Sequence, residues 1–529
     1  MNDAFDNPSA LKIFWGDSHH NLFVASDRQL DLEGVCREAR KHLDFLPLAY
    51  YTALDEPYRP EMNASGTSGI SLEGWKPQKM LEQEWAQIEE ATRQFNAEGS
   101  FVTFPGYEWH GNGTDGDHNV IFPREGGKVH RVDRLTELYR CLRDEPAYAI
   151  PHHTAYLAGH RGRDWSVCDE RITPFAEIFS CHGCSETDEE WVGMRSNPQM
   201  GPNFGGGTYQ DALNRGLHLG AICSTDSFGG SKLSGRFGFG LMACLATGLS
   251  RQELWEAFGA RRVYGVTGDR IALDFTINGQ HMGSRLIDSG IRQVRVEAEG
   301  LDAIDRIELL RNDRVIATHC HQGHWNAPRS GHEVRMRFRI ECGWGPSHLR
   351  FQVPPKAWKG ELTLSAGRFM AAWPCWVSTG QSLAVLNGNR ATFEMLSRPE
   401  HVRERWQNAN VFEVLARPED RLQFRINGLE DSFSLSELLR TSRGIYDHQG
   451  AVAMLAQARN LRVEEAERAD IYHHVAHKVK IHRGIPADGY TALLEVNDDW
   501  PLSEEVHYRV RVEQRNGQRA WSSPIWVRP

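Results

Sequence analysis

Six short stretches of the chain combine histidine, glutamate and aspartate, the residue types that bind divalent metals and move protons. Each of them contains or follows an apolar run, and they are Gly16–Asn21, Gly106–Trp109, Gly116–Asn119, Ile150–His153, Phe179–Gly183 and Ser224–Ser227. Imidazoles and carboxylates gathered at one place can hold a cation, and a held cation makes water nucleophilic near neutral pH. These residues therefore indicate metal-dependent hydrolysis.

The apolar runs alternate with helical stretches throughout the first half of the chain. The pattern predicts strands at residues 11–16, 43–51, 101–104, 147–151, 177–181 and 219–224, and helices at 31–42, 79–94 and 250–261. Strands alternating with helices indicate an α/β fold with a largely parallel sheet, open or closed into a barrel. Because the carboxyl ends of such strands meet at one edge, we expect the six stretches to converge there.

The pattern changes near residue 270. Two-residue alternation at 271–277, 292–299, 304–311, 335–340 and again at 507–527 is typical of an antiparallel β-sandwich. A helical interruption is expected near 434–440 and 450–459. The sequence thus predicts a metal-binding catalytic domain at 1–270 and a β-rich sandwich domain at 271–529.

Charge and hydropathy argue against two classes of protein, nucleic-acid binders and membrane-spanning proteins. The formal net charge is -10, with both signs interspersed and no basic stripe, so a nucleic-acid binder is not expected. Residues 1–10 lack a basic and apolar leader, and no window approaches 18 apolar residues, so we expect a cytoplasmic protein that does not span a membrane. The expected partner is a small anionic substrate. Whether the protein forms a homo-oligomer stays open.

Several stretches also carry a resemblance to a known family. They are Phe14–His19, Leu43–Leu46, Phe104–Trp109, Ile150–His153, Ser224–Ser227, Arg261–Gly268 and Ala520–Trp526. Together they resemble the PHP (polymerase and histidinol phosphatase) superfamily, in the branch called domain of unknown function 3604. The resemblance implies a distorted seven-stranded β/α barrel that holds up to three metal ions, in a family consisting mostly of phosphoesterases.

Position by position, the resemblance implies a partly altered ligand set. The family's ligands fall on His19, Asn21, Glu108, His118, His152 and Asp226, and an acidic position falls on Asp27. Asn21 replaces a histidine, Tyr50-Tyr51 replace an Asp-His pair, and Phe228 replaces the last histidine. The third metal site, at positions 27, 51 and 228, should therefore be lost.

The two remaining sites would share Glu108. One would use His19, Asn21 and Asp226 with it, and the other His118 and His152. An amide oxygen is a weaker ligand than an imidazole, and Asn21 is as readily a strand cap as a ligand. We expect one firmly held ion (Mn, Zn or Fe), a looser or absent second ion, and no third.

Other residues could act on the substrate. His182 and His153 are candidate general acids or bases, although a structural hydrogen bond at His182 and simple packing at His153 are open alternatives. Loop cations that could bind an anionic group, or could simply be solvated, are Arg161, Arg163, Lys232 and Arg236.

Three functions are compatible with these features. The first is a metal-dependent hydrolase of phosphate or related esters. The second is a metal-dependent lyase or a non-phosphate hydrolase acting on carbohydrate-like substrates, with Tyr51 as an acid or base. The third, motivated by the altered ligands, is a degenerate barrel that serves as a binding or scaffold protein. Metal content separates the third function from the first two.

Overall fold

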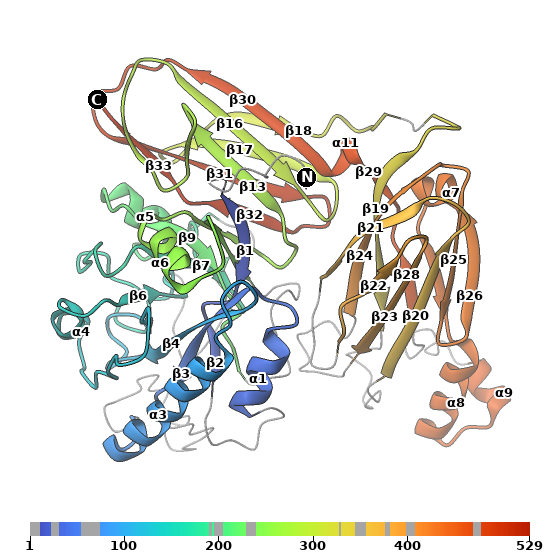
Figure 1. The fold of residues 1–529 in the computed structure, drawn as a ribbon, viewed down its shortest axis with the longest axis horizontal. Coiled ribbons are helices and arrows are strands. Elements are labelled where there is room, and N and C mark those ends of the chain that lie inside the picture. Colours follow the sequence, from blue (N-terminus) through green and yellow to red (C-terminus); the bar gives the residue numbers. More distant parts are fainter. Residues whose placement is uncertain are drawn as a thin grey trace. The chain divides into compact units, whose positions relative to one another are not determined.

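The computed structural model describes residues 11–22, 31–53, 75–189, 193–194, 205–228, 240–326, 329–343, 356–375, 381–397, 408–468 and 478–529. The chain forms two compact units (Figure 1). Unit 1 comprises Met1–Ala298, Asp305–Cys320 and Leu493–Pro529, and unit 2 comprises Glu299–Ile304 and His321–Ala492. This division differs from the expected domains 1–270 and 271–529, because the last strands of the chain pair with strands of the first half. No helix among the described residues is long and apolar enough to cross a membrane.

Unit 1 is built around a long mixed sheet in the order β15-β33-β31-β32-β12-β11-β1-β3-β4-β5-β6. Its strands from the first half of the chain are β1 (Lys12–Gly16), β2 (His20–Leu22), β3 (Phe45–Tyr51), β4 (Val102–Trp109), β5 (His118–Ile121), β6 (Tyr148–Pro151), β10 (Ser227–Phe228), β11 (Leu241–Ala246) and β12 (Val263–Val266). A separate three-stranded sheet contains β7 (Phe175–Ser180), β8 (Gly183–Cys184) and β9 (Gly220–Cys223). The helices are α1 (Leu32–Ala39), α3 (Gln78–Phe95), α4 (Leu135–Leu142), α5 (Tyr209–Asn214) and α6 (Arg251–Gly259).

The α/β class is present, but the sheet is less parallel than expected. Strand β3 is parallel to β1, β2 and β4, whereas β5 is antiparallel to both of its neighbours, β4 and β6. The loop between β4 and β5 is too short for the crossover that parallel neighbours need. The described strands of the first half of the chain lie in two separate sheets, so the closed seven-stranded barrel stays a prediction.

Alternation along β3 and β4 sorts the sheet into two faces. On one face lie Phe45 and Phe104, followed toward the carboxyl ends by Tyr51 and Glu108, which are paired in register. Phe45 and Phe104 belong to an apolar cluster to which α6 contributes Phe258. This face is therefore apolar at the amino ends of the strands and polar at their carboxyl ends.

The remaining strands of unit 1 add antiparallel layers. They are β13 (Ala272–Ile277), β14 (Gln280–His281), β15 (Arg285–Ile287), β16 (Arg292–Glu299), β17 (Ile304–Arg311), β18 (Arg314–Cys320), β30 (Thr491–Asp498), β31 (Val506–Gln514), β32 (Arg519–Ser522) and β33 (Ile525–Arg528). Strand β32 pairs with β12 and so joins the end of the chain to the sheet that begins at β1.

Unit 2 is a β-sandwich of a six-stranded and a five-stranded sheet. The strands are β19 (Val334–Cys342), β20 (Lys356–Leu364), β21 (Arg368–Pro374), β22 (Val385–Asn387), β23 (Arg390–Ser397), β24 (Asn408–Ala416), β25 (Arg421–Ile426), β26 (Leu429–Ser434), β27 (Arg443–Tyr446), β28 (Lys478–Ile481) and β29 (Ile485–Pro486). The expected helical interruption is confirmed, and the helices are α7 (Leu435–Arg440), α8 (His448–Arg459), α9 (Val463–Glu467) and α11 (Ala487–Tyr490). Both sheets contribute to one core that contains Phe338, Trp358, Phe393 and Phe412.

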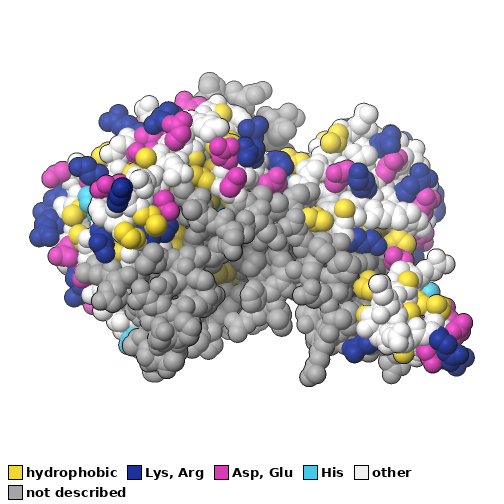
Figure 2. Space-filling view, turned by 90° about the horizontal axis from the view of Figure 1, so that it is seen from below, with side chains coloured by type: hydrophobic (Ala, Val, Ile, Leu, Met, Phe, Trp, Pro, Cys, Tyr) yellow, Lys and Arg dark blue, Asp and Glu magenta, His cyan; other side chains and the backbone are white. Residues whose placement is uncertain are grey.

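The surface carries charges of both signs. On the face shown in Figure 2, Lys and Arg side chains alternate with Asp and Glu side chains over the described residues. This mixture matches the interspersed charges of the sequence.

Candidate metal centre

Four predicted ligands from separate parts of the chain meet in unit 1. Glu108 lies near the end of β4, and His19, His152 and Asp226 lie in the turns after β1, β6 and β9. Glu108 Oε1 is 3.3 Å from His152 Nε2 and 3.7 Å from His19 Nε2, and His19 Nε2 is 3.4 Å from Asp226 Oδ1. The six stretches were expected to converge at one sheet edge, and the structure brings these four residues together.

Each of the four residues in this cluster has a side-chain atom that makes no hydrogen bond. His19 Nε2, Glu108 Oε2, His152 Nε2 and Asp226 Oδ2 are all buried and without a hydrogen-bond partner. Orphaned buried polar atoms are rare and cost about 1–3 kcal/mol each, more for charged groups. Ligands about 2.1 Å from one ion lie roughly 3.0–3.4 Å from each other, close to the separations seen here. The residues therefore fit a divalent metal ion.

Glu177 on β7 orients the first of these ligands. Its Oε2 accepts a hydrogen bond from His19 Nδ1 at 3.3 Å and another from the Ser224 hydroxyl. The bond occupies Nδ1 and directs Nε2 of His19 toward Glu108 and Asp226. A carboxylate behind a histidine in this way is the usual support of a metal-binding imidazole.

Burial and mutual charge set the protonation states. Burial raises the pKa of Glu108, but the neighbouring His110, His152 and His19 outweigh it and hold that pKa well below its ordinary value. Burial, together with His19 and His153, lowers the pKa of His152 to about 3. Burial raises the pKa of Asp226 to about 7. An ionised Glu108 and a neutral His152 are the forms that bind metals.

The two predicted proton-transfer histidines lie beside this cluster. His182 Nε2 is 3.2 Å from Asp226 Oδ2, and its Nδ1 is hydrogen-bonded to the hydroxyl of Tyr156 at 2.9 Å. The side chain of His182 is 15% exposed, whereas that of Asp226 is 3% exposed. The ring of His153 lies 4.9 Å from that of His182. His153, His182 and Asp226 also form a group whose ligand atoms converge.

The predicted substrate-binding cations divide into three cases. The Arg161 guanidinium donates from Nε to Asp117 Oδ2 at 2.6 Å, with its side chain 11% exposed. Arg163 is 1% exposed and donates to the Asp164 carbonyl, so it is held within the fold. Lys232 and Arg236, like the predicted ligand position Asp27, lie outside the described residues.

The other predicted site residues are placed by the strand register. Asn21 on β2 is 1% exposed and neither atom of its amide makes a hydrogen bond. Tyr51 shares the face of Glu108, and its ring lies 5.1 Å from that of His110. His118 is paired with Trp109, whereas Asn119 is paired with Glu108, so His118 points to the opposite face. The structure does not bring His118 into any of the converging groups formed by described residues.

Three residues in the converging groups were not singled out from the sequence for any role. They are His110, Asp117 and Glu177. The spacing Glu-x-His at 108–110 was an available signal, because residues two apart on a strand share a face. Asp117 was visible in the stretch Gly116–Asn119, but its neighbour His118 was preferred. Glu177 lies inside a strand and carried no comparable signal.

Three residues in or beside the cluster have left-handed backbone conformations, which residues other than glycine rarely adopt. The φ angles of His153, Arg161 and Asp226 are 36°, 66° and 46°. Such residues cost about 1–3 kcal/mol each and persist where the surroundings hold them, often at functional sites. The hydrogen bond from Asp226 N to the His19 carbonyl, at 2.7 Å, is one such restraint.

The segment that bears His182 is anchored by the end of the chain. The carboxylate of Glu186, which is fully buried, accepts hydrogen bonds from Arg509, from Arg511 Nε at 2.6 Å and from Trp521 Nε1 at 2.7 Å. Strands β31 and β32 carry these three donors. We refer to this group as the Glu186 anchor.

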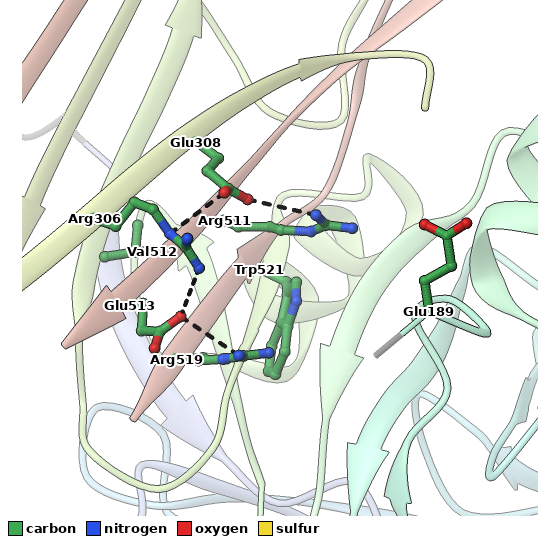
Figure 3. A pocket seen from close by; sticks show the side chains of 8 residues that line it. All are labelled: Glu189, Arg306, Glu308, Arg511, Val512, Glu513, Arg519 and Trp521. Carbon is green, nitrogen blue, oxygen red and sulfur yellow. Dashed lines mark hydrogen bonds and ion pairs between the residues drawn. The ribbon is translucent and has the colours of Figure 1, made fainter. Parts of the chain in front are cut away.

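A charged pocket of about 200 Å³ lies beside the Glu186 anchor (Figure 3). Its lining consists of Glu189, Arg306, Glu308, Arg511, Val512, Glu513, Arg519 and Trp521. Arg306 contacts Glu513 at 3.0 Å and Glu308 at 3.3 Å, and Arg519 contacts Glu513 at 3.4 Å. These charges neutralise one another, so the pocket shows no preference for an anion or a cation.

Comparisons with known proteins give limited similarities. No protein-family model matches the chain. An uncharacterized protein of Chlamydia pneumoniae is 25% identical over 257 residues, and one of Chlamydia trachomatis serovar D is 27% identical over 252 residues. Each match covers 44% of this chain and 40% of the relative, so the chain spans about two fifths of the relatives' length.

Among solved structures, one match of low similarity is aligned over much of both chains. It is a two-domain protein from Bacteroides vulgatus described as containing a predicted PHP-like metal-dependent phosphoesterase. The identity is 11% and the TM-score 0.30, with 80% of this chain and 95% of that chain covered. The candidate metal centre therefore stands on its own geometry.

Proposed function

We propose that this protein is a metal-dependent hydrolase of phosphate or related esters that carry an anionic group. The observation that carries the proposal is the environment of Glu108. Its Oε1 lies within 3.0–3.7 Å of the Nε2 atoms of His110, His152 and His19, and none of these three nitrogens makes a hydrogen bond. A buried carboxylate surrounded by unsatisfied imidazoles is best explained by a shared cation.

His19, Glu108, His152 and Asp226 would hold the ion, with Asn21 as a further oxygen ligand. When bound, a divalent ion lowers the pKa of water from 15.7 to about 7 and so supplies a nucleophile at neutral pH. Glu177 keeps His19 in the required orientation through its hydrogen bond at Nδ1. Because the ligands are buried, bulk water is kept from the reacting groups.

His182 would be the residue that moves a proton. It lies next to Asp226. The side chain of His182 is more exposed to solvent than that of Asp226. The Tyr156 hydroxyl at Nδ1 fixes the ring, so that Nε2 faces the cluster. Arg161, held by Asp117, would bind the anionic group of the substrate through its guanidinium.

A direct test is the variant Glu108→Gln, with metal content measured by elemental analysis and turnover measured on phosphomonoesters and phosphodiesters. We expect metal and activity to fall together, with turnover reduced at least about 100-fold. The matched control is Glu253→Gln, since Glu253 lies in the first turn of helix α6. A Glu108→Gln protein that keeps full metal content contradicts the proposal.

A second candidate is a metal-dependent lyase or a hydrolase of non-phosphate substrates. It is favoured by Tyr51, a phenol on the face of Glu108 and beside His110, where an acid or base could act on a sugar-like substrate. Here the variant Tyr51→Phe should abolish turnover of such substrates. Rapid turnover of phosphate esters by that variant would support the first proposal instead.

A further inference from the structure

Asn21 carries a donor group that a metal ion cannot satisfy. Its side chain is buried, with the residue 1% exposed, and neither Oδ1 nor Nδ2 makes a hydrogen bond to a described residue. An ion could bind the amide oxygen, which has lone pairs. The amide nitrogen has two hydrogens and no lone pair to give to a cation, so it needs an acceptor atom. A bound ion therefore accounts for only one of the two polar atoms of this side chain.

The strand register places Asn21 on the face of the sheet that bears Glu108. Asn21 on β2 is paired with Ala49 on β3 in a parallel ladder, in which paired residues share a face. Two residues further along β3, Tyr51 is paired with Glu108 on β4. Because alternate residues of a strand point to the same side, the amide of Asn21 lies on the side of Tyr51 and Glu108. The methyl group of Ala49 has no polar atom to offer it.

The free amide nitrogen differs in kind from the unsatisfied atoms of the four metal ligands. Those atoms are imidazole nitrogens and carboxylate oxygens, which can all give a lone pair to a cation. A buried donor without an acceptor destabilises the folded protein, and such groups are rare in native structures. An acceptor that arrives with the substrate would explain why the fold leaves this nitrogen free.

Arg161 supplies positive charge near the same side chains. Burial lowers the pKa of its guanidinium, but Asp117, Tyr51 and Glu108 outweigh burial and raise that pKa above its ordinary value. Arg161 is therefore charged and interacts with the two residues whose face Asn21 shares. A guanidinium and an amide donor at one centre suit an oxyanion, because hydrogen bonds to charged acceptors are the strong ones.

We propose that Asn21 Nδ2 donates a hydrogen bond to an anionic oxygen of the substrate, on the phosphoryl group of the ester. The proposal rests on the proposed function. Oδ1 of the same amide stays available to the ion. Asn21 is thus a substrate-binding residue and not only a weaker substitute for a histidine ligand.

The experiment measures the binding of inorganic phosphate to the full chain at saturating Mn²⁺ by isothermal titration calorimetry. The decisive variant is Asn21→Leu, which has a similar shape, adds no charge and removes the donor. Its Kd for phosphate should rise about tenfold or more, the factor expected for one hydrogen bond to a charged acceptor. Elemental analysis should find the Mn²⁺ content of the wild type, since the four other ligands remain.

The matched control is Asn410→Leu. Asn410 on β24 of unit 2 is also 1% exposed and has an Nδ2 atom without a hydrogen bond. This control should leave phosphate binding and Mn²⁺ content unchanged. Asn21→Ala removes the same donor with a smaller side chain, so it replaces Asn21→Leu if the leucine prevents folding.

The outcomes separate this role from the proposed function. A folded Asn21→Leu or Asn21→Ala protein with the wild-type Kd for phosphate overturns the role of Asn21 and leaves the proposed function standing. Loss of Mn²⁺ from these variants at saturating Mn²⁺ overturns that role as well, because the amide would then serve the ion alone. A wild type that holds Mn²⁺ but neither binds phosphate nor hydrolyses phosphate esters overturns the proposed function, and the role of Asn21 falls with it.

Discussion

Two regions of the molecule bury charged side chains, but only one of them supplies those side chains with hydrogen-bond partners. In unit 2, Arg337 is 2% exposed but donates to Glu413 Oε2 at 2.8 Å and to the Gly300 carbonyl, and the rings of Trp373 and Tyr490 lie 4.5 and 4.1 Å from its guanidinium. In unit 1, Glu108 is as deeply buried, yet Oε2 makes no hydrogen bond. The sandwich buries charge that the protein itself satisfies. The candidate metal centre buries a carboxylate with one oxygen that makes no hydrogen bond to a described residue, so the two regions should respond differently to mutation and to chelation.

The largest expected effect comes from the sandwich core. Phe412 is fully buried, with the rings of Phe338, Phe369 and Phe393 at 5.9, 6.0 and 5.7 Å. Phe412→Ala should lower the free energy of unfolding of unit 2 by about 3–5 kcal/mol. Metal content should not change, and the smaller change Phe412→Leu should cost less. Denaturant unfolding with elemental analysis checks both, and a loss of metal would break the contrast between the regions.

Metal removal should lower the free energy of unfolding of unit 1 alone. The loss should be somewhat smaller than the loss that Phe412→Ala causes in unit 2. An ion present at 100 to 1,000 times its Kd stabilises the folded state by about 2.7–4.1 kcal/mol. Chelation should therefore increase hydrogen exchange in peptides that contain Glu108 or His152, with no change in peptides from β19 or β24. Equal changes in both units would show that the orphaned atoms of the centre are not where the ion binds.

The smallest effects test whether the two units unfold separately. Ser250 and Ser434 accept hydrogen bonds from Glu253 N and Glu437 N, each at 3.2 Å, and so cap α6 in unit 1 and α7 in unit 2. Ser250→Ala and Ser434→Ala should each cost about 1 kcal/mol, felt only in the unit that contains the cap. Hydrogen exchange measures this, and Ser→Thr at each position serves as the control.

The sequence predicted the site better where a residue follows an apolar run. The metal-type residues at the ends of apolar runs followed from the pattern, and the family resemblance selected His19, Glu108, His152 and Asp226 among them, which the structure brings together. The choice between Asp117 and His118 depended on the register of β5 against β4, which pattern alone does not fix. The position of Arg163, within the fold rather than at the site, depended on tertiary packing in the same way.

The local sequence pattern also could not predict the division of the chain into units. Residues 272–320 and 506–528 alternate as a sandwich does, and nothing in their alternation says that β32 will pair with β12. Such pairings join segments about 250 residues apart, and they are decided by the complementary faces that remain when the earlier strands have formed.

The Glu186 anchor has a consequence for the order of events during synthesis. Arg509 follows Glu186 by 323 residues. At roughly 5–20 residues per second, the ribosome adds that stretch in about 15–65 seconds. Throughout that interval the segment bearing His182 lacks its three donors, while His19, Glu108 and His152 are already made. The segment that bears His182 is thus anchored by a part of the chain that emerges long after the candidate metal ligands.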